Sequence, residues 1–250
     1  MFNDLMNVAV LNRNELVCER SALLAARLNV PVVYELSLNF EFYLEYRNDL
    51  KLVLLSRDLP KADVSVDFGH DFAKLSRSKA FSKGSLLGKA IGMGGGGNPT
   101  VFDATAGLGR DFLVFLGMGL RVIAVEKSPL VFELLMDGQA RYPFERLRIL
   151  HGDSQFFMKG IDAERPEVVY LDPMYPEKKK RSLPKKEMQL LQKLLGADDN
   201  GPDLFAAAIA FATQRVVVKR PCNAPPLAGR PTHSFSGKAV RFDMYLVEKN

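Results

Sequence analysis

The chain has 250 residues, a formal net charge of +5 and two cysteines. Its length suits one large domain, alone or with a small one attached. Cys18 and Cys222 lie far apart, and neither has a cysteine or histidine at metal-ligand spacing, which excludes a disulfide framework and a zinc site. Every apolar run is too short to span a membrane, and the first residues lack a signal pattern. We therefore expect a soluble, cytoplasmic protein with no metal and no membrane partner.

The positive charge is concentrated in two segments. Gly69–Gly92 and Met174–Leu190 each carry a net charge of +4, and the rest of the chain sums to −3. Such runs are more often solvated surface than binding sites. Because these two segments hold the whole positive excess, they are candidates for contact with phosphates.

The first part of the chain predicts a small α/β subdomain. An apolar run at Val8–Leu11 precedes a helical stretch at Glu15–Leu28. Extended segments follow without helices between them, at Val32–Leu36, Phe40–Tyr46, Leu50–Leu55 and Val64–Phe68. We expect this subdomain to be mostly antiparallel.

The pattern changes to alternating strands and helices after residue 100. A short helix is predicted at Ser85–Ile91, and the glycine run Gly94–Gly97 then breaks the chain. The strands predicted next are Val101–Asp103, Arg121–Val125, Leu147–Leu150, Val168–Leu171, Arg215–Lys219 and Phe242–Val247, with helices beginning at Arg110 and spanning Pro129–Arg141. This order predicts a doubly wound, mostly parallel sheet whose ligands bind at the carboxyl ends of its strands. The predicted domains are an α/β subdomain at 1–68, a basic, glycine-rich connector at 69–99 and an α/β domain at 100–250.

A glycine loop follows the first of these strands, from Asp103 to Asp111. Its glycines permit a tight turn and a close approach of the backbone to a ligand, and the next helix offers free N–H groups. A plain strand-to-helix turn is the simpler alternative. The candidate cofactor-binding residues of the loop are Asp103, Ala104, Gly107, Gly109 and Asp111.

The loop favours S-adenosylmethionine over a dinucleotide. A pyrophosphate needs a third glycine, but that position is Phe112, and Asp111 would repel a phosphate. Carboxylates at 103 and 111 suit a ligand with ammonium and sulfonium groups instead. Glu126 ends the next strand, where an acidic residue accepts hydrogen bonds from ribose in nucleotide-binding folds; the alternative for Glu126 is an exposed strand-end carboxylate.

Asp153 admits two interpretations on sequence alone. It follows the third strand, in the run His151-Gly152-Asp153-Ser154, where a carboxylate can accept a hydrogen bond from an adenine amino group. It is equally suited to be the N-cap of a helix that runs through Phe157.

The fourth strand leads into Asp172-Pro173-Met174-Tyr175-Pro176, which predicts the chemical site. An exocyclic base amine is a poor nucleophile because its lone pair is delocalised into the ring. The Asp172 carboxylate and the Pro173 carbonyl can accept its hydrogens, and Tyr175 offers a face for an extruded base. Methyl transfer from a sulfonium then needs positioning and polar stabilisation, without a metal or a covalent nucleophile. An ordinary turn is the structural alternative.

Basic residues directly follow this motif and also lie before the glycine loop. A phosphate backbone can bind there. The candidate RNA-binding residues are Lys178, Lys179, Lys180, Arg181, Lys185, Lys186, Arg77 and Lys79.

Residues 64–247 resemble the bacterial small-subunit ribosomal RNA guanine-N2 methyltransferase J family. The similarity is carried by the Asp103–Asp111 loop, Val168–Pro176, Lys185–Met188, Arg215–Pro221 and Arg241-Phe242-Asp243. The resemblance implies a class I methyltransferase fold, S-adenosylmethionine as donor, and a guanine 2-amino group of ribosomal RNA, naked or in the small subunit, as acceptor. It also implies cofactor contacts at Arg110, Asp111, Glu126, Lys127, Asp153, Ser154 and Asp172.

The sequence departs from the family at two positions of the site. Tyr175 replaces an expected phenylalanine and keeps the stacking face, and Asp153 stands where a small hydroxyl residue is frequent. The chain before residue 64 matches weakly. Three other functions stay open: an amino methyltransferase of DNA or another RNA, a non-catalytic RNA-binding protein, and a nucleotide-dependent oxidoreductase.

Overall fold

The structure is a computed structural model that describes residues 5–95, 97–160, 165–173, 186–196 and 201–248. The chain forms two compact units, and each is built from segments that are not continuous in sequence. The first contains the described residues of Met1–Val66, Glu133–Ala140 and Glu177–Gly196, and the second those of Asp67–Phe132, Arg141–Pro176 and Ala197–Asn250.

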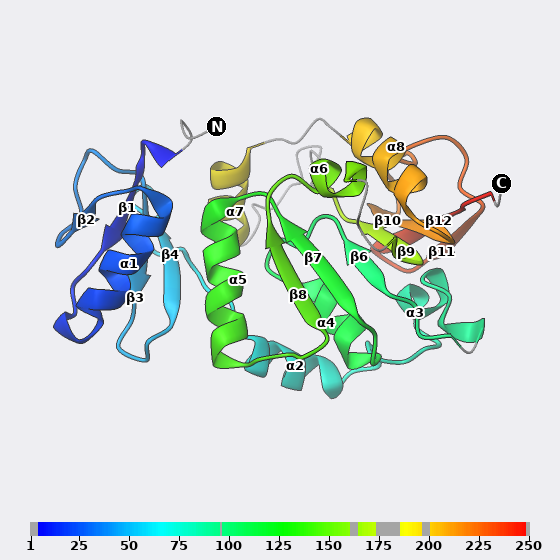
Figure 1. The fold of residues 1–250 in the computed structure, drawn as a ribbon, viewed down its shortest axis with the longest axis horizontal. Helices are drawn as coiled ribbons and strands as arrows, with labels where there is room; N and C mark the ends of the chain where they lie inside the picture. Colours follow the sequence, from blue (N-terminus) through cyan, green and yellow to red (C-terminus); the bar gives the residue numbers. More distant parts are fainter. Residues whose placement is uncertain (1–4, 96, 161–164, 174–185, 197–200, 249–250) are drawn as a thin grey trace. The chain divides into compact units, whose positions relative to one another are not determined.

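A seven-stranded sheet organises the second unit, in the order β11-β12-β10-β9-β6-β7-β8 (Figure 1). Its strands are β6 (Val101–Asp103), β7 (Val122–Glu126), β8 (Leu147–His151), β9 (Val168–Leu171), β10 (Arg215–Pro221), β11 (His233–Ser236) and β12 (Val240–Leu246). The five strands from β10 to β8 run parallel, and β12 pairs antiparallel with both β10 and β11. The predicted doubly wound, mostly parallel sheet is confirmed.

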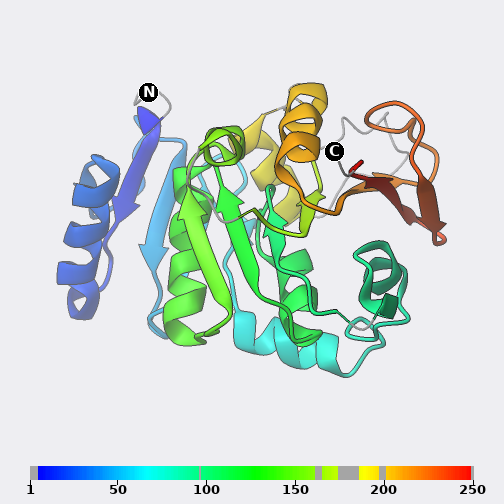
Figure 2. The same ribbon diagram turned by 45° about the vertical axis from the view of Figure 1, so that its right-hand side comes forward.

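Helices pack on both faces of this sheet (Figures 1 and 2). The helices of the second unit are α2 (Phe68–Ser76), which packs on α4, α3 (Leu86–Ala90), α4 (Arg110–Gly117), α6 (Ser154–Lys159) and α8 (Gly201–Phe211), with a short 3-10 turn, η3 (Met93–Gly95). Helix α5 (Pro129–Arg141) is divided between the units, and its residues Glu133–Ala140 belong to the first. Side chains of a strand point alternately to its two faces. Val169 and Leu171 join the buried cluster that includes Met158 of α6 and Ala208 of α8, whereas Tyr170 points the other way and packs edge-on against Phe115 of α4.

The strand order reverses between β6 and β9. From β6 the chain proceeds outward through β7 and β8, and then returns to place β9 on the other side of β6. Loops that leave two such neighbouring strands diverge, which opens a crevice at their carboxyl ends where ligands bind in doubly wound folds. The glycine loop follows β6 and Asp172 follows β9, so both begin at the strand ends where this crevice is expected.

The first unit is built on a five-stranded mixed sheet, in the order β2-β1-β3-β4-β5. Its elements are β1 (Val8–Leu11), the 3-10 turn η2 (Glu15–Val17), α1 (Cys18–Leu28), β2 (Val32–Val33), β3 (Phe42–Tyr46), β4 (Leu52–Ser56), β5 (Asp63–Val64) and α7 (Lys186–Leu195). The expected antiparallel pairing is found for β3 with β4 and for β4 with β5. Strand β1 pairs parallel with both β2 and β3, so the sheet is mixed and not mostly antiparallel. Helix α1 provides the crossover that parallel pairing of β1 and β2 requires.

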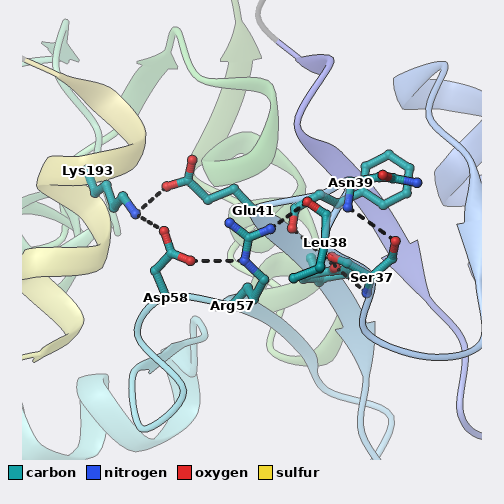
Figure 3. Close-up of polar contacts among 9 residues, drawn as sticks. Ser37, Leu38, Asn39, Glu41, Arg57, Asp58 and Lys193 are labelled. Carbon is teal, nitrogen blue, oxygen red and sulfur yellow. Dashed lines mark hydrogen bonds and ion pairs between the residues drawn. The ribbon is translucent and has the colours of Figure 1, made fainter.

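Helix α7 is joined to the strands of the first unit by charged side chains (Figure 3). The ammonium of Lys193 lies 2.6 Å from an Asp58 carboxylate oxygen and also pairs with Glu41. Arg57 donates to the other Asp58 oxygen and to the carbonyl oxygen of Leu38. These groups are exposed or partly exposed, so they specify where α7 packs more than they stabilise the unit.

Several elements differ from the sequence-based expectations. Residues 64–68 do not form a strand: β5 ends at Val64, and Phe68 begins α2, with the Asp67 carboxylate accepting from the His70 N–H as the N-cap. Asp67 at this position is a helix-start signal that outweighs the apolar alternation before it. Helices α7 and α8 and strand β11 were also not predicted. No helix of the described residues is long and apolar enough to cross a membrane.

Candidate active site

The glycine loop after β6 has backbone angles that favour glycine. Gly107 has φ +52° and Gly109 has φ +82°, both in the left-handed region. A Cβ at Gly109 would also overlap the ring of Phe112, which is fully buried in α4. The turn therefore brings bare backbone to the carboxyl edge of the sheet, and α4 begins directly after it at Arg110.

Asp103 is a buried carboxyl group at the tip of β6, with 1% of its surface exposed. One oxygen accepts from the Thr105 N–H at 3.1 Å, and the other has no hydrogen-bond partner among the described residues. Burial raises the pKa of Asp103 to about 8, and the nearby Asp111 carboxylate acts in the same direction. The site thus contains a desolvated carboxyl oxygen that has no hydrogen-bond partner among the described residues.

Glu126, at the end of β7, braces the glycine loop. Its carboxylate accepts from the Gly107 N–H at 2.9 Å and from the Ser128 N–H at 2.7 Å. Glu126 is buried rather than an exposed strand-end carboxylate, and burial raises its pKa to about 7. Each carboxylate oxygen retains lone-pair capacity, so the predicted ribose contact and the observed bracing are compatible.

Asp172 is connected to the glycine loop through both its backbone and its side chain. Its N–H donates to the Thr105 hydroxyl at 2.7 Å, and one carboxylate oxygen, Oδ2, accepts from the Lys219 ammonium at 2.9 Å. Its carboxyl group also interacts with that of Asp111, which raises the pKa of Asp172. Pro173 is buried, and Tyr175 lies outside the described residues.

A second carboxylate shares the Lys219 ammonium. Asp111, in the first turn of α4, accepts from Lys219 at 2.8 Å and from the Tyr170 hydroxyl at 2.7 Å. Burial alone would lower the pKa of Lys219, but the carboxylates of Asp111 and Asp172 outweigh it, and the pKa is raised above its usual value. Lys219 is therefore a cation at physiological pH.

Neither Tyr170 nor Lys219 was a candidate site residue from the sequence. Each is a polar residue within an apolar strand, in Val168-Val169-Tyr170-Leu171 and Val216-Val217-Val218-Lys219. A polar side chain on a buried strand needs a partner. That rule is the signal that could have identified both.

The structure shows Asp153 as a helix cap. Its carboxylate accepts from the Gln155 N–H at 2.9 Å at the start of α6, and it forms an exposed ion pair with Lys127 at 3.5 Å. Ser154 is buried at the first position of α6. The predicted capping role of Asp153 is confirmed, and its contact with adenine stays a prediction.

The candidate RNA-binding residues fall into two groups. Arg77 and Lys79 are exposed just after α2, and Lys186 is exposed at the start of α7. The remaining candidates, Lys178, Lys179, Lys180, Arg181 and Lys185, lie outside the described residues.

The chemistry of this crevice matches a cationic nucleoside. It combines a turn without Cβ atoms, an unpaired buried oxygen at Asp103, and carboxylates at Asp111 and Asp172 that share one ammonium. A pyrophosphate would meet the Asp111 carboxylate at the helix start, whereas sulfonium and ammonium groups would be attracted to it. Within the described part of the chain, no group of three or more His, Cys, Asp or Glu side chains is placed to hold a metal ion.

Known proteins agree with this assignment. A family model described as "Putative SAM-dependent methyltransferase" matches residues 24–247. The chain is 40% identical to the ribosomal RNA small subunit methyltransferase J of Pseudomonas fluorescens (strain Pf0-1), over 88% of this chain and 87% of that protein. The protein of the same name from Shewanella amazonensis is 41% identical, over 83% of this chain and 88% of the relative.

The chain belongs to the methyltransferase J family. The crystal structure of a SAM-dependent methyltransferase from Neisseria gonorrhoeae superposes with a TM-score of 0.72 at 31% identity, covering 96% of this chain and 95% of that one. The resemblance over residues 64–247 is thus confirmed, and the match begins earlier in the chain than was expected. This member of the methyltransferase J family is an enzyme with a class I methyltransferase fold, and S-adenosylmethionine is its cofactor.

Proposed function

We propose that this enzyme transfers a methyl group from S-adenosylmethionine to the exocyclic 2-amino group of a guanine in small-subunit (16S) ribosomal RNA, in the cytoplasm. The observation that carries the proposal is the position of Asp172: it lies at the crevice, tied to the cofactor loop by Thr105 and Lys219. The names of the relatives support ribosomal RNA as the substrate. The choice of guanine follows the family resemblance.

The geometry of the loop supports the proposed cofactor-binding residues. S-adenosylmethionine supplies an electrophilic methyl group on a sulfonium centre. The bare backbone at Gly107 and Gly109 admits the ligand, and the free oxygen of Asp103 accepts from an ammonium. Glu126 holds the loop and offers its remaining lone pairs to ribose. The proposed cofactor set is completed by Ala104, Arg110, Asp111, Lys127, Asp153, Ser154 and Asp172.

The acceptor amine is activated by hydrogen-bond acceptors. The Oδ1 atom of Asp172 and the Pro173 carbonyl oxygen accept hydrogen bonds from its two N–H groups. These bonds favour a tetrahedral nitrogen with a localised lone pair. Tyr175 stacks on the extruded base. Because the displacement is in line, the residues contribute by orientation and polar stabilisation, each worth about 100-fold or more in rate.

The substrate is tested by mass spectrometry of ribosomal RNA from cells with and without the gene. We expect one methylguanosine of the small subunit to disappear and to return with the wild-type gene. Complementation with Asp172→Ala should fail, and Tyr175→Ala should restore the modification partly. Calorimetry with S-adenosylhomocysteine shows whether Asp172→Ala also loses the cofactor contact that the resemblance implies for Asp172. An unchanged small-subunit RNA would show that the acceptor is another RNA or DNA.

Calorimetry separates the other classes of function. A folded protein that binds S-adenosylhomocysteine and not NAD excludes the oxidoreductase. Binding of S-adenosylhomocysteine together with wild-type complementation by Asp172→Ala would contradict the role assigned to Asp172. A purified protein that binds RNA but supports no methyl transfer to any amine would be the non-catalytic alternative.

A further inference from the structure

Lys219 is a charged side chain near the end of a central, buried strand. The three residues before it in β10, Val216 to Val218, are fully buried. Strand β10 pairs with β12 along its length and with β9 from Arg215 to Val218. The Lys219 side chain is 25% exposed, and its ammonium contacts two carboxylates at 2.8 and 2.9 Å. Burying a charged lysine costs folding free energy, and this cost is offset only when the charge is paired and hydrogen-bonded.

One of the two carboxylates belongs to the proposed cofactor site and the other to the proposed acceptor site. Asp111 starts the helix that follows the cofactor loop, and the Tyr170 hydroxyl donates a hydrogen bond that fixes its carboxylate. Asp172 is the first residue of the acceptor motif, Asp172–Pro176, which is proposed to hold the base that is methylated. In the sheet, Val218 of β10 lies opposite Leu171 of β9, so Lys219 is level with Asp172. By alternation along the strands, Tyr170 and Lys219 lie on the face covered by α4.

We propose that Lys219 is a positioning residue for methyl transfer, whose ammonium clamps Oδ2 of Asp172 to the cofactor-loop helix and leaves Oδ1 directed to the acceptor amine. This inference rests on the proposed function. It assigns Lys219 no contact with the substrate: the residue acts through the carboxylate of Asp172. One ammonium has three donors, so it can bond to both carboxylates at once.

The same ammonium controls the ionisation of Asp172. The charged and titratable groups around Asp172 are Lys219 from β10, Asp111 from α4, Asp103 from β6 and Tyr170 from β9. Burial raises the pKa of Asp172, Lys219 lowers it, and Asp111 raises it again. Without Lys219 the pKa must rise further, and the carboxylate that accepts the amine hydrogen is lost at a higher pH than in the wild type.

The test compares Lys219→Met and Lys219→Arg with Lys159→Met, a matched control at an exposed lysine of α6 in the same unit. Transfer of labelled methyl groups to small subunits from cells lacking the gene is measured between pH 6 and 9. For Lys219→Met we expect kcat to fall about 100-fold, with KM for RNA changed by less than about threefold. In the plot of kcat against pH, the decrease on the acid side (the acid limb) should move to higher pH by about one unit or more. Lys159→Met should behave as the wild type.

Lys219→Arg keeps the charge but not the shape of the donor. We expect its acid limb to stay at the wild-type pH while kcat recovers partly, because a planar guanidinium pairs with one carboxylate in a fork rather than bridging two. Calorimetry with S-adenosylhomocysteine and thermal melting show which variants are folded. If Lys219→Met does not fold, Lys219→Arg decides: an acid limb displaced upward despite the retained charge would overturn the inference.

Two other results would overturn it directly. The first is near-normal kcat in folded Lys219→Met, and the second is a reduced kcat without displacement of the acid limb. Failure of the proposed function has a different signature, since the wild type then methylates no small-subunit RNA. In that case the carboxyl carbon of Asp172 is titrated by NMR in the wild type and Lys219→Met, and an unchanged pKa would refute the clamp.

Discussion

Asp103 and Glu126 are the two most strongly buried acids of the site, with pKa values raised to about 8 and about 7 by burial. A carboxyl whose pKa is higher in the folded than in the unfolded state binds more protons when folded. Its contribution to stability is therefore present at low pH and is lost as the pH rises through the folded pKa. For Asp103 this window extends from about pH 4 to about pH 8.

The substitution Asp103→Asn should remove this dependence. The amide keeps an oxygen for the Thr105 N–H but carries no charge, so any cost of burying its NH2 group is the same at every pH. Urea unfolding at pH 6 and pH 8.5 should show that the variant gains at least about 1 kcal/mol relative to the wild type at the higher pH, one pKa unit being worth about 1.4 kcal/mol. An identical difference in unfolding free energy at both values would contradict the raised pKa.

Site residues at strand ends were predictable because a strand end can be located from its apolar run. Asp103, Glu126 and Asp172 all lie where the sequence places them, at the carboxyl ends of β6, β7 and β9. Tyr170 and Lys219 lie within strands, and their roles depend on which face of the sheet each one meets. That information is tertiary, so a single sequence could show two unexplained polar residues but not their common partner, Asp111.

Helix α6 depends on a side chain for which sequence alone left two roles open. The Asp153 carboxylate caps the helix by accepting from the Gln155 N–H. Asp153→Ala should lower the free energy of unfolding by about 1 kcal/mol, whereas Asp153→Ser, which can cap as well, should leave it within a few tenths.

The same pair of variants separates capping from cofactor binding. If Asp153 only caps α6, Asp153→Ser binds S-adenosylhomocysteine as the wild type does, measured by calorimetry. A weakened affinity in Asp153→Ser with unchanged stability would instead support the adenine contact. An equal decrease in stability in both variants would show that the cap contributes little.

At the level of elements, the sequence predicted the strands and helices whose apolar residues recur with a clear period. It did not predict features that depend on how distant strands pair. The strands from β6 to β9 and helix α5 follow from their patterns. Helix α8, Gly201–Phe211, is apolar around most of its circumference and shows no amphipathic period. Parallel pairing of β1 with β3 joins strands that are distant in sequence, and the local pattern of each strand is the same in either orientation.

At the scale of the molecule, the basic segment 174–190 connects two units. It follows β9 and Asp172 of the second unit, and it leads into α7, whose Lys193 pairs with Asp58 in the first unit. Four consecutive basic residues, Lys178 to Arg181, lie in the sequence between the acceptor motif and α7. If RNA is the substrate, we expect these residues to bind its phosphates.

Salt dependence tests this expectation. Replacing Lys178, Lys179, Lys180 and Arg181 by glutamine should weaken RNA binding and reduce the slope of log K against log salt by roughly 0.7 to 0.9 for each phosphate that the variant no longer neutralises. The control replaces the same number of exposed basic residues elsewhere: Lys61, Arg121, Arg148 and Lys159. Both proteins lack four charges of the wild type, so a general electrostatic effect changes the two slopes equally. A larger reduction of the slope in the first variant, with affinity for S-adenosylhomocysteine unchanged, locates the bound phosphates at the segment. Equal slopes in the two variants would show that these residues are solvated and bind no phosphate.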